Sequence, residues 1–335
     1  MSLISAPAAA QNGKGNGKGN GGGGSEPPAA FEPAIGYRYE GRGFTDIRLA
    51  NRAGDQACTV LRFEDGGPRL RGFGLDAANM RLAYGLGNDA IYLATLTYVG
   101  ENPCPVALEE DTELIGPTSS NSFDFIDFSP DGALATWTES DEDYTGLGSS
   151  GIIAIYDLET GETTHLTLEQ WHNEPRPEWG TNGEWAVGSI RFSPDFAATN
   201  EIIFSGAPLN GYQGAYNSIW AYNINEMAAP RKIYDGAGIW IDAIVTVTNP
   251  QGMGEHRVAF TDNDTGNMLQ VRVSDGVPVE TFPASEPAYS CDNSELIHNG
   301  GRRKIYITSA DGTSSQRWGG SGMRFFDWFC PGTAP

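Results

Sequence analysis

Several carboxylates and arginines occur at equivalent places in a repeated sequence pattern. These are the residues with which this chain could do chemistry. Each lies on or beside an apolar segment that we expect to be the innermost strand of a sheet. Such carboxylates could act as general acid and base or bind a cation. They could equally be solvated, or paired with arginine, around a water-filled channel. The channel candidates are Asp124, Asp127, Arg191, Asp242, Arg324 and Asp327, with Arg71 as a further partner.

No known catalytic motif accompanies these residues. The chain has no G-x-S-x-G elbow, and its four histidines (His165, His172, His256 and His298) lack H-E-x-x-H or similar spacing. The segment Asp262–Gly266 resembles part of a calcium loop but lacks the spaced bidentate glutamate, which favours a polar hairpin turn. We therefore predict no cofactor and no metal site, with bound calcium as the unsupported alternative, and no catalytic residues.

Aromatic residues gather in three long segments, Glu139–Gly151, Leu168–Val187 and Gly206–Asn217. Aromatic side chains supply large contact area at low entropic cost, so a cluster of them in loops is typical of a recognition surface. The alternative is that these rings cap the protein core or pack loop against loop. The predicted binding face comprises Tyr144, Trp171, His172, Trp179, Trp185, Tyr212 and Tyr216.

A repeated hairpin determines how these residues must be arranged. The clearest copies, around Ser129-Pro-Asp131 and Ser193-Pro-Asp195, each join two apolar strands. Proline presets the turn and aspartate caps its amides, so the turn has a local physical cause. Aligned positions in all copies lie 40 to 64 residues apart, the period of a four-stranded propeller blade: Asp76, Asp131, Asp195, Gln251, Asp292 and Gly332.

The sequence therefore predicts an all-β fold, a six-bladed β-propeller with four-stranded blades. The chain begins with strands that lack an inner partner and ends with a strand near Phe325–Phe329 that begins an unfinished unit. These halves complete one another, so we expect the two ends of the chain to share one blade and close the ring. Closure removes the exposed sheet edges that an open stack would present.

The same motifs resemble the TolB-like propeller repeat, in which an aromatic residue and Ser-Pro-Asp-Gly are followed by an apolar strand and a later Ile-Tyr-x-x-Asp. The resemblance covers about residues 34–335 and is strong at two turns and partial at four. It implies the propeller fold and little about function. TolB has an additional α/β domain before its propeller, where this sequence has only a tether, so no partner-binding residues are carried over.

In a propeller the chain runs through strands A to D from the axis outwards. We call the face with the A–B and C–D turns the turn face, and the face with the B–C turns and D-to-A connections the crossing face. The three aromatic segments belong to the crossing face, whereas all four cysteines belong to the turn face. We predict the disulfides Cys58–Cys104 and Cys291–Cys330, although four cysteines permit three connectivities.

Composition limits the partners and suggests the compartment. The formal net charge of −22 disfavours nucleic acid, and no apolar run is long enough to cross a membrane. Ala8-x-Ala10 resembles a secretory cleavage site and precedes a Gly/Asn-rich tract. We predict a signal-peptide remnant and flexible tether over residues 1–33 and the propeller over 34–335. Export to the periplasm or cell exterior is favoured over a cytosolic protein with an Ala-rich start.

These observations favour an exported, non-enzymatic binding or scaffold propeller that recognises a protein or glycan at the cell envelope through its aromatic long-loop face. Two alternatives stay open. One is a hydrolase or lyase that uses the channel carboxylates, and the other is a structural subunit that assembles with copies of itself.

Overall fold

Twenty-four strands pair into six antiparallel sheets of four strands each in the computed structural model. It describes residues 32–67, 69–87, 90–98, 106–115, 121–141, 151–166, 185–208, 218–226, 230–236, 241–248, 255–262, 265–300 and 304–329. All of these belong to the compact unit Phe31–Pro335. The helix α1 (Phe196–Thr199) is the single α-helix among them. No helix in this part of the chain is long and apolar enough to span a membrane.

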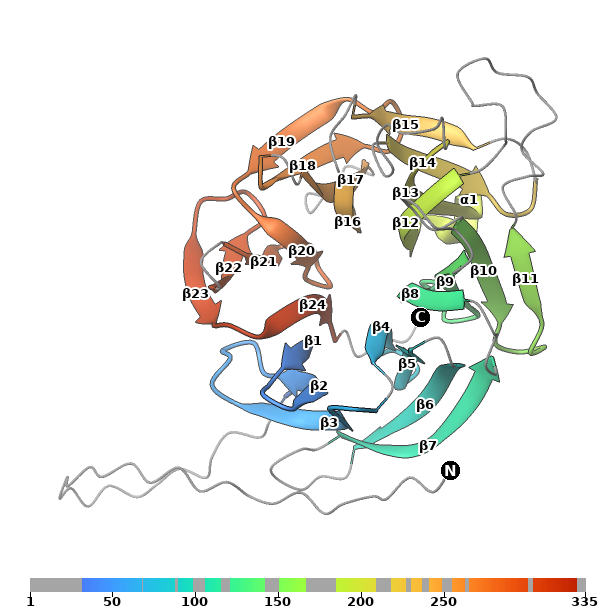
Figure 1. The fold of residues 1–335 in the computed structure, drawn as a ribbon. Coiled ribbons are helices and arrows are strands. Elements are labelled where there is room, and N and C mark those ends of the chain that lie inside the picture. Colours follow the sequence, from blue (N-terminus) through green and yellow to red (C-terminus); the bar gives the residue numbers. More distant parts are fainter. Residues whose placement is uncertain are drawn as a thin grey trace. The chain divides into compact units, whose positions relative to one another are not determined.

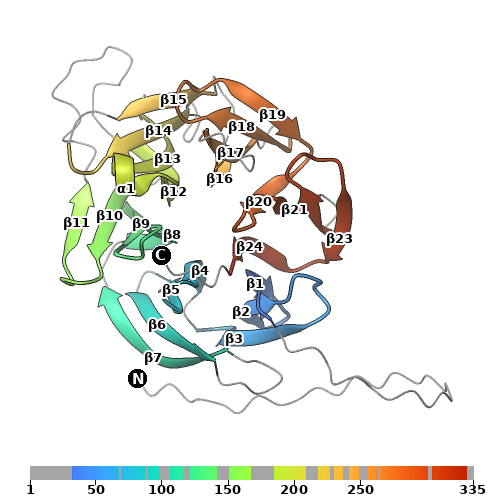
Figure 2. The same cartoon turned by 180° about the vertical axis from the view of Figure 1, so that it is seen from behind.

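The six sheets are the blades of a ring (Figures 1 and 2). Blade 1 contains β24 (Met323–Trp328), β1 (Ile35–Glu40), β2 (Phe44–Ala50) and β3 (Ala57–Glu64). Blade 2 contains β4 (Leu70–Asp76), β5 (Arg81–Leu86), β6 (Ala90–Tyr98) and β7 (Val106–Ile115). Blade 3 contains β8 (Asn121–Phe128), β9 (Leu134–Asp141), β10 (Gly151–Asp157) and β11 (Thr163–Leu166).

The remaining blades repeat this order from the inside outwards. Blade 4 contains β12 (Trp185–Phe192), β13 (Glu201–Pro208), β14 (Ser218–Asn223) and β15 (Arg231–Asp235). Blade 5 contains β16 (Ile241–Thr248), β17 (His256–Asp262), β18 (Asn267–Arg272) and β19 (Pro278–Phe282). Blade 6 contains β20 (Ser285–Tyr289), β21 (Glu295–Asn299), β22 (Ile305–Ser309) and β23 (Ser315–Gly319). The innermost strands β4, β8, β12, β16, β20 and β24 contact one another in sequence around the axis.

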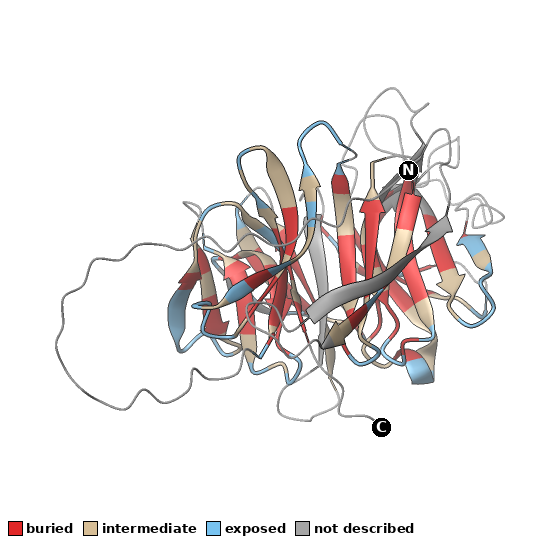
Figure 3. Cartoon of the chain, turned by 90° about the horizontal axis from the view of Figure 1, so that it is seen from below, coloured by how far each residue is buried: buried red, intermediate tan, exposed pale blue. Residues whose placement is uncertain are grey.

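Burial explains the sequence of each blade. Because a blade packs between two neighbours, its second strand is covered on both faces, and Ile202, Ile203 and Phe204 of β13 are all fully buried. Outer strands are more exposed, and in β23 Trp318 is the one buried residue. Figure 3 shows buried residues along the middle of the strands and exposed residues towards their ends. The core is therefore a set of interfaces between blades.

The two ends of the chain meet in blade 1, as predicted. Strand β24 pairs antiparallel with β1, placing Trp328 opposite Ile35 and Arg324 opposite Arg38. The backbone N–H of Phe329 continues this pairing by donating to the carbonyl of Ala34 at 2.8 Å. The sheet has no free inner edge at the closure, which confirms the six-bladed closed ring.

Each inner strand has the same irregularity near its middle. In all six blades the register between the first and second strands shifts, which marks a β-bulge. Three of the residues at this point, Phe125, Glu286 and Phe325, have left-handed backbone with φ between 51° and 53°. A bulge bends a strand and increases its twist. Because the bulge recurs at one place, we attribute the left-handed residues to the ring architecture.

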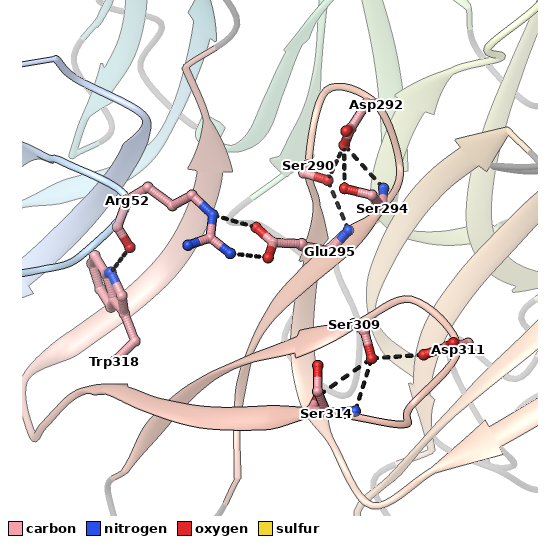
Figure 4. Close-up of polar contacts among 9 residues, drawn as sticks. All are labelled: Arg52, Ser290, Asp292, Ser294, Glu295, Ser309, Asp311, Ser314 and Trp318. Carbon is pink, nitrogen blue, oxygen red and sulfur yellow. Dashed lines mark hydrogen bonds and ion pairs between the residues drawn. The ribbon is translucent and has the colours of Figure 1, made fainter.

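The repeated turn is held by one serine and one aspartate. Ser129 Oγ donates to Asp131 Oδ1 at 2.6 Å, and that oxygen also accepts the Ala133 N–H at 3.0 Å. The turn around Ser290 and Asp292 repeats these contacts at 2.7 and 3.0 Å. These donors, led by the Ser294 N–H, lower the pKa of Asp292 to about 2. A third copy, Ser309 with Asp311, lies at a C–D turn (Figure 4).

The contacts between blade 6 and blade 1 include an aromatic anchor and an ion pair (Figure 4). The Trp318 Nε1–H donates to the Arg52 carbonyl at 3.0 Å, and its ring meets Tyr37 edge to face at 5.7 Å. The Arg52 guanidinium in turn makes a two-pronged contact with the Glu295 carboxylate. This interface joins the N-terminal strands to the C-terminal blade without a covalent connection between β1–β3 and blade 6.

The described cysteines are both oxidised. Cys58 on β3 and Cys291 in the β20–β21 turn are disulfide-bonded. Their predicted partners, Cys104 and Cys330, lie outside the described residues. The pairing Cys58–Cys104 and Cys291–Cys330 therefore stays a prediction.

Replacing Trp318 should destabilise the protein far more than breaking the ion pair beside it. We expect Trp318→Ala to lower the free energy of unfolding by about 3 kcal/mol or more, because it empties a buried site and removes a hydrogen bond. Arg52→Gln should cost less than about 1 kcal/mol, because the Arg52 side chain is half exposed. Urea unfolding of both variants checks the order, and equal losses would contradict it.

The turn aspartate Asp292 should contribute stability that acid removes. Its pKa is about 2 in the folded protein and about 3.9 when unfolded, so the contribution is present above pH 4 and is lost as the pH falls towards 2. We expect Asp292→Asn to be less stable than wild type at pH 6, with the gap in thermal midpoint closing between pH 4 and 2. The exposed Glu226→Gln serves as control, and a gap that is constant with pH would contradict the assignment.

Candidate functional site

Two carboxylates and one arginine come together on the inner strands. Asp127 (β8), Arg191 (β12) and Asp327 (β24) belong to blades 3, 4 and 1 and precede the last residue of their strands by one position. The charges of Asp127 and Arg191 both act on Asp327. We call these three residues the inner-strand cluster. All three were predicted as channel residues, and the fold brings them together.

Each carboxylate of the cluster bonds to the backbone of the following blade. Asp127 Oδ2 accepts the Phe192 N–H of blade 4 at 2.9 Å, and Asp327 Oδ2 accepts the Leu75 N–H of blade 2 at 3.2 Å. Between them, Gly74 of blade 2 lies so close to blade 3 that a Cβ atom would come within 2.7 Å of the Ile126 carbonyl. The carboxylates therefore act as links between adjacent inner strands.

Arg191 supplies the positive charge of the cluster. Its Nη1 lies 3.6 Å from Asp127 Oδ1, and it donates to the Ile126 carbonyl at 3.4 Å. The side chains of Asp127 and Arg191 keep 23% and 26% of their exposure, so solvent reaches both. The pair is thus a partly hydrated ion pair between blades 3 and 4.

Burial perturbs both acids in the same direction. It raises the pKa of Asp127, and the Arg191 charge and the Phe192 amide oppose this only in part. Burial likewise raises the pKa of Asp327 to about 6, against the lowering effect of Arg191 and with an added increase from the Asp127 charge. Asp327 can therefore exchange a proton close to neutral pH. Such a group can act in acid–base chemistry where a substrate reaches it.

The other predicted channel residues are not part of the inner-strand cluster. Asp124 lies on β8 and Asp242 on β16, both inner strands as expected, but their side chains lie outside the described part of the structure. Arg324 lies exposed at the start of β24, and Arg71 lies near the start of β4. Within the described ranges, no three His, Cys, Asp or Glu side chains are placed to hold a metal ion. Asp262 uses its carboxylate to cap its own turn, accepting the Thr265 hydroxyl at 2.6 Å.

The predicted aromatic binding face is mostly outside the described residues. This applies to Tyr144, Trp171, His172, Trp179, Tyr212 and Tyr216. In chain order, residues 142–150 and 209–217 connect a second strand to a third, and residues 167–184 connect the outermost strand of blade 3 to the innermost strand of blade 4.

Four boundaries of these segments were wrong, and among them Gly151 begins β10 and Gly206 belongs to β13. Trp185 is not a loop residue but begins β12, where its backbone pairs with Pro208. Glu139 belongs to β9 rather than to a loop, and it is buried where it accepts the Trp137 indole N–H at 2.9 Å. At Trp185 and Glu139 the strand extends further than the run of apolar residues predicts, because a neighbouring strand pairs with its backbone.

Sequence reasoning missed a cavity of about 280 Å³ on blade 6. The buried His298 lines it, stacked on Tyr306 at 5.9 Å, and its Nε2 lies 2.9 Å from Thr308 Oγ1. Thr308 donates its own proton to Ser315 Oγ, so Nε2 is the donor to Thr308 and Nδ1 is left as an acceptor. Nδ1 has no partner among the described residues. The sequence clue is His298 in a strand of buried apolar residues.

Comparison with known proteins supports the fold and goes no further. No protein-family model matches the sequence, and no curated protein matches it. A crystal structure of a nidogen/laminin complex is similar, with a TM-score of 0.58 over 89% of this chain and 98% of that one. The sequence identity is 9%, so the likeness concerns the fold alone. The chain is a six-bladed β-propeller.

Neutralising Asp327 should make the protein more stable at neutral pH. Its pKa is about 6 when folded and about 3.9 when unfolded, so ionising it costs stability as the pH rises from 4 to 6. In Asp327→Asn the amide oxygen can still accept the Leu75 N–H. We expect a higher thermal midpoint than wild type at pH 7 and an advantage that shrinks as the pH falls from 6 to 4. An advantage independent of pH would show that the ionised carboxylate is not its cause.

Proposed function

We propose that this chain is a non-enzymatic binding propeller that recognises a protein or a glycan through its crossing face. We expect the long connections of blades 3 and 4, residues 142–150, 167–184 and 209–217, on that face, because they join second to third strands or an outermost strand to the next innermost one. They hold aromatic residues, among them Trp171 and Trp179. Aromatic side chains dominate the binding energy of many protein interfaces. The concentration of aromatic residues in these three connecting segments of the sequence is the observation that carries the proposal.

The opposite face supports the same choice. On the turn face, Asp131, Asp292 and Asp311 direct their carboxylates to the amides and hydroxyls of their own turns. Their hydrogen-bonding capacity is thereby largely used within the turn. The resemblance in fold to a structure solved as a nidogen/laminin complex is compatible with a scaffold that binds protein.

The inner-strand cluster supports an enzyme less well. The raised pKa of Asp327 is what a general acid or base would need. However, Asp127 and Asp327 each use one carboxylate oxygen to accept a backbone N–H of the next blade. That contact gives both residues a structural role. A hydrolase or lyase therefore ranks second, and activity lost in Asp327→Asn without a change in fold would raise it to first.

We also propose that the protein is exported and belongs with TolB-like propellers. The Ser-Pro-Asp turns at Ser129 and Ser193 support the kinship. The Ala8-x-Ala10 sequence and the oxidised state of Cys58 and Cys291 support an oxidising compartment. The partner would then lie at the cell envelope.

Removing the loop aromatics should abolish binding without unfolding the ring. We expect Trp171→Ala/Trp179→Ala to recover at least tenfold less of a partner protein or glycan from the native envelope fraction, because each ring supplies buried contact area. The matched control is Val277→Ser, an exposed residue on the turn face. Quantitative pull-down, with thermal midpoints for all three proteins, makes the comparison. Equal recovery by both variants would overturn the proposed face.

A further inference from the structure

Four arginines meet where blades 1 and 2 adjoin, and we call them the arginine cluster: Arg38, Arg69, Arg71 and Arg324. Arg38 on β1 is paired in register with Arg324 on β24. Its Nη1 reaches across to blade 2 and donates to the Arg71 carbonyl at 3.3 Å. Arg69 immediately precedes β4. The positive charges of Arg69 and Arg324 add to burial in lowering the pKa of Arg38. Like charges are therefore held close together.

These arginines have few partners of opposite charge. Arg38 bonds to Glu40 at 2.6 Å, whereas Arg69, Arg71 and Arg324 make no side-chain hydrogen bond or ion pair with any described residue. The Nε atoms of Arg38 and Arg71 are buried, and neither has a hydrogen-bond partner in the described ranges. Arg38 itself is only 6% exposed. Buried donors without acceptors are costly, so a group that supplied acceptor oxygens here would be bound favourably.

Scarcity of acid does not explain the cluster. The chain has 43 Asp and Glu against 21 Lys and Arg, two acidic groups for each basic one. Eight other arginines each meet a carboxylate: Arg48, Arg52, Arg62, Arg81, Arg191, Arg231, Arg257 and Arg272. The arginine cluster is therefore a local concentration of positive charge in an acidic protein.

The position of the cluster leaves it open to a ligand. Arg324 and Arg71 lie near the starts of β24 and β4, where these strands enter from the crossing face, and Figure 1 shows the two strands side by side at the inside of the ring. The Phe325 ring lies 5.3 Å from the Arg38 guanidinium and is 40% exposed. Arg324 and Arg69 are exposed as well. An incoming group would meet guanidinium donors beside an aromatic ring.

We propose that the arginine cluster binds a tetrahedral oxyanion, a sulfate or phosphate group. Guanidinium presents its N–H donors in a planar fork that fits such oxygens, including the Nε–H groups that have no acceptor here. A doubly charged group also offsets several like charges, which a single carboxylate does less well. The group could be a free ion or an ester on a larger molecule. The proposal goes beyond the proposed function, because it uses residues where blades 1 and 2 adjoin and none of the loop aromatics.

Calorimetric titration tests the site directly. We expect saturable binding of sulfate and phosphate to wild type at low ionic strength, and none of acetate or chloride at matched ionic strength. Arg71→Gln/Arg324→Gln should bind sulfate at least about tenfold more weakly, because it removes two unpaired guanidinium groups. Arg317→Gln is the matched control, since Arg317 is exposed and donates only to the Gly319 carbonyl. Titration with a sulfated disaccharide and with its unsulfated parent shows which form is preferred. Tighter binding of the sulfated disaccharide than of free sulfate would indicate an ester.

The thermal midpoint in anion-free buffer distinguishes a ligand site from a structural one. Loss of like charges should leave the double variant as stable as wild type or more so, while the stabilisation that sulfate gives wild type disappears. Equal sulfate binding by the double variant, equal loss in Arg317→Gln, acetate binding as tight as sulfate, or a lower midpoint of the double variant without anion would each overturn the proposal.

Discussion

Pairing between β24 and β1 is the interaction on which the rest of the structure depends. It joins strands from opposite ends of the chain, so it is the strand pairing that closes the longest loop of chain. Once formed, it gives blade 1 its inner strand and removes the free edges of β1 and β24. It also positions Asp327 against Leu75 and Arg324 beside Arg38. The contacts of Asp327 and Arg324 are therefore products of closure, whereas the Asp127–Arg191 pair joins blades 3 and 4.

The features that the sequence reveals best are those with local causes. A turn such as Ser129–Asp131 satisfies its own amides within a few residues, so its residue types recur wherever the turn recurs. Counting such turns was enough to predict six blades and the shared first blade. The turn that follows Asp76 departs from the repeated sequence but could still be recognised. Its aspartate also caps the turn, because Asp76 Oδ1 accepts the Asn79 N–H at 3.1 Å.

The contacts that the sequence conceals involve groups that any residue can supply. Asp127 and Asp327 bond to backbone amides of Phe192 and Leu75, and a backbone N–H leaves no trace in the choice of side chain. The inner-strand bulges shift the register, so counting alternate residues misplaces side chains beyond them. Arg38 and Arg324 become neighbours only through closure. The residues that form the inner strands could thus be predicted, but the residues that their side chains contact could not.

The aspartates of this chain show how position determines the effect of one residue type. Asp292 and Asp327 both accept backbone amides, yet the pKa of the first is lowered and that of the second is raised. The difference arises because burial outweighs hydrogen bonding on the inner strands, whereas solvent reaches the turn. On β24 the acid at Asp327 lies three residues beyond the base at Arg324, further from the crossing face. On this strand the positive charge therefore lies nearer the crossing face, whereas on β12 Arg191 lies nearer the turn face. An anionic group that approaches β24 from the crossing face would meet Arg324 before Asp327.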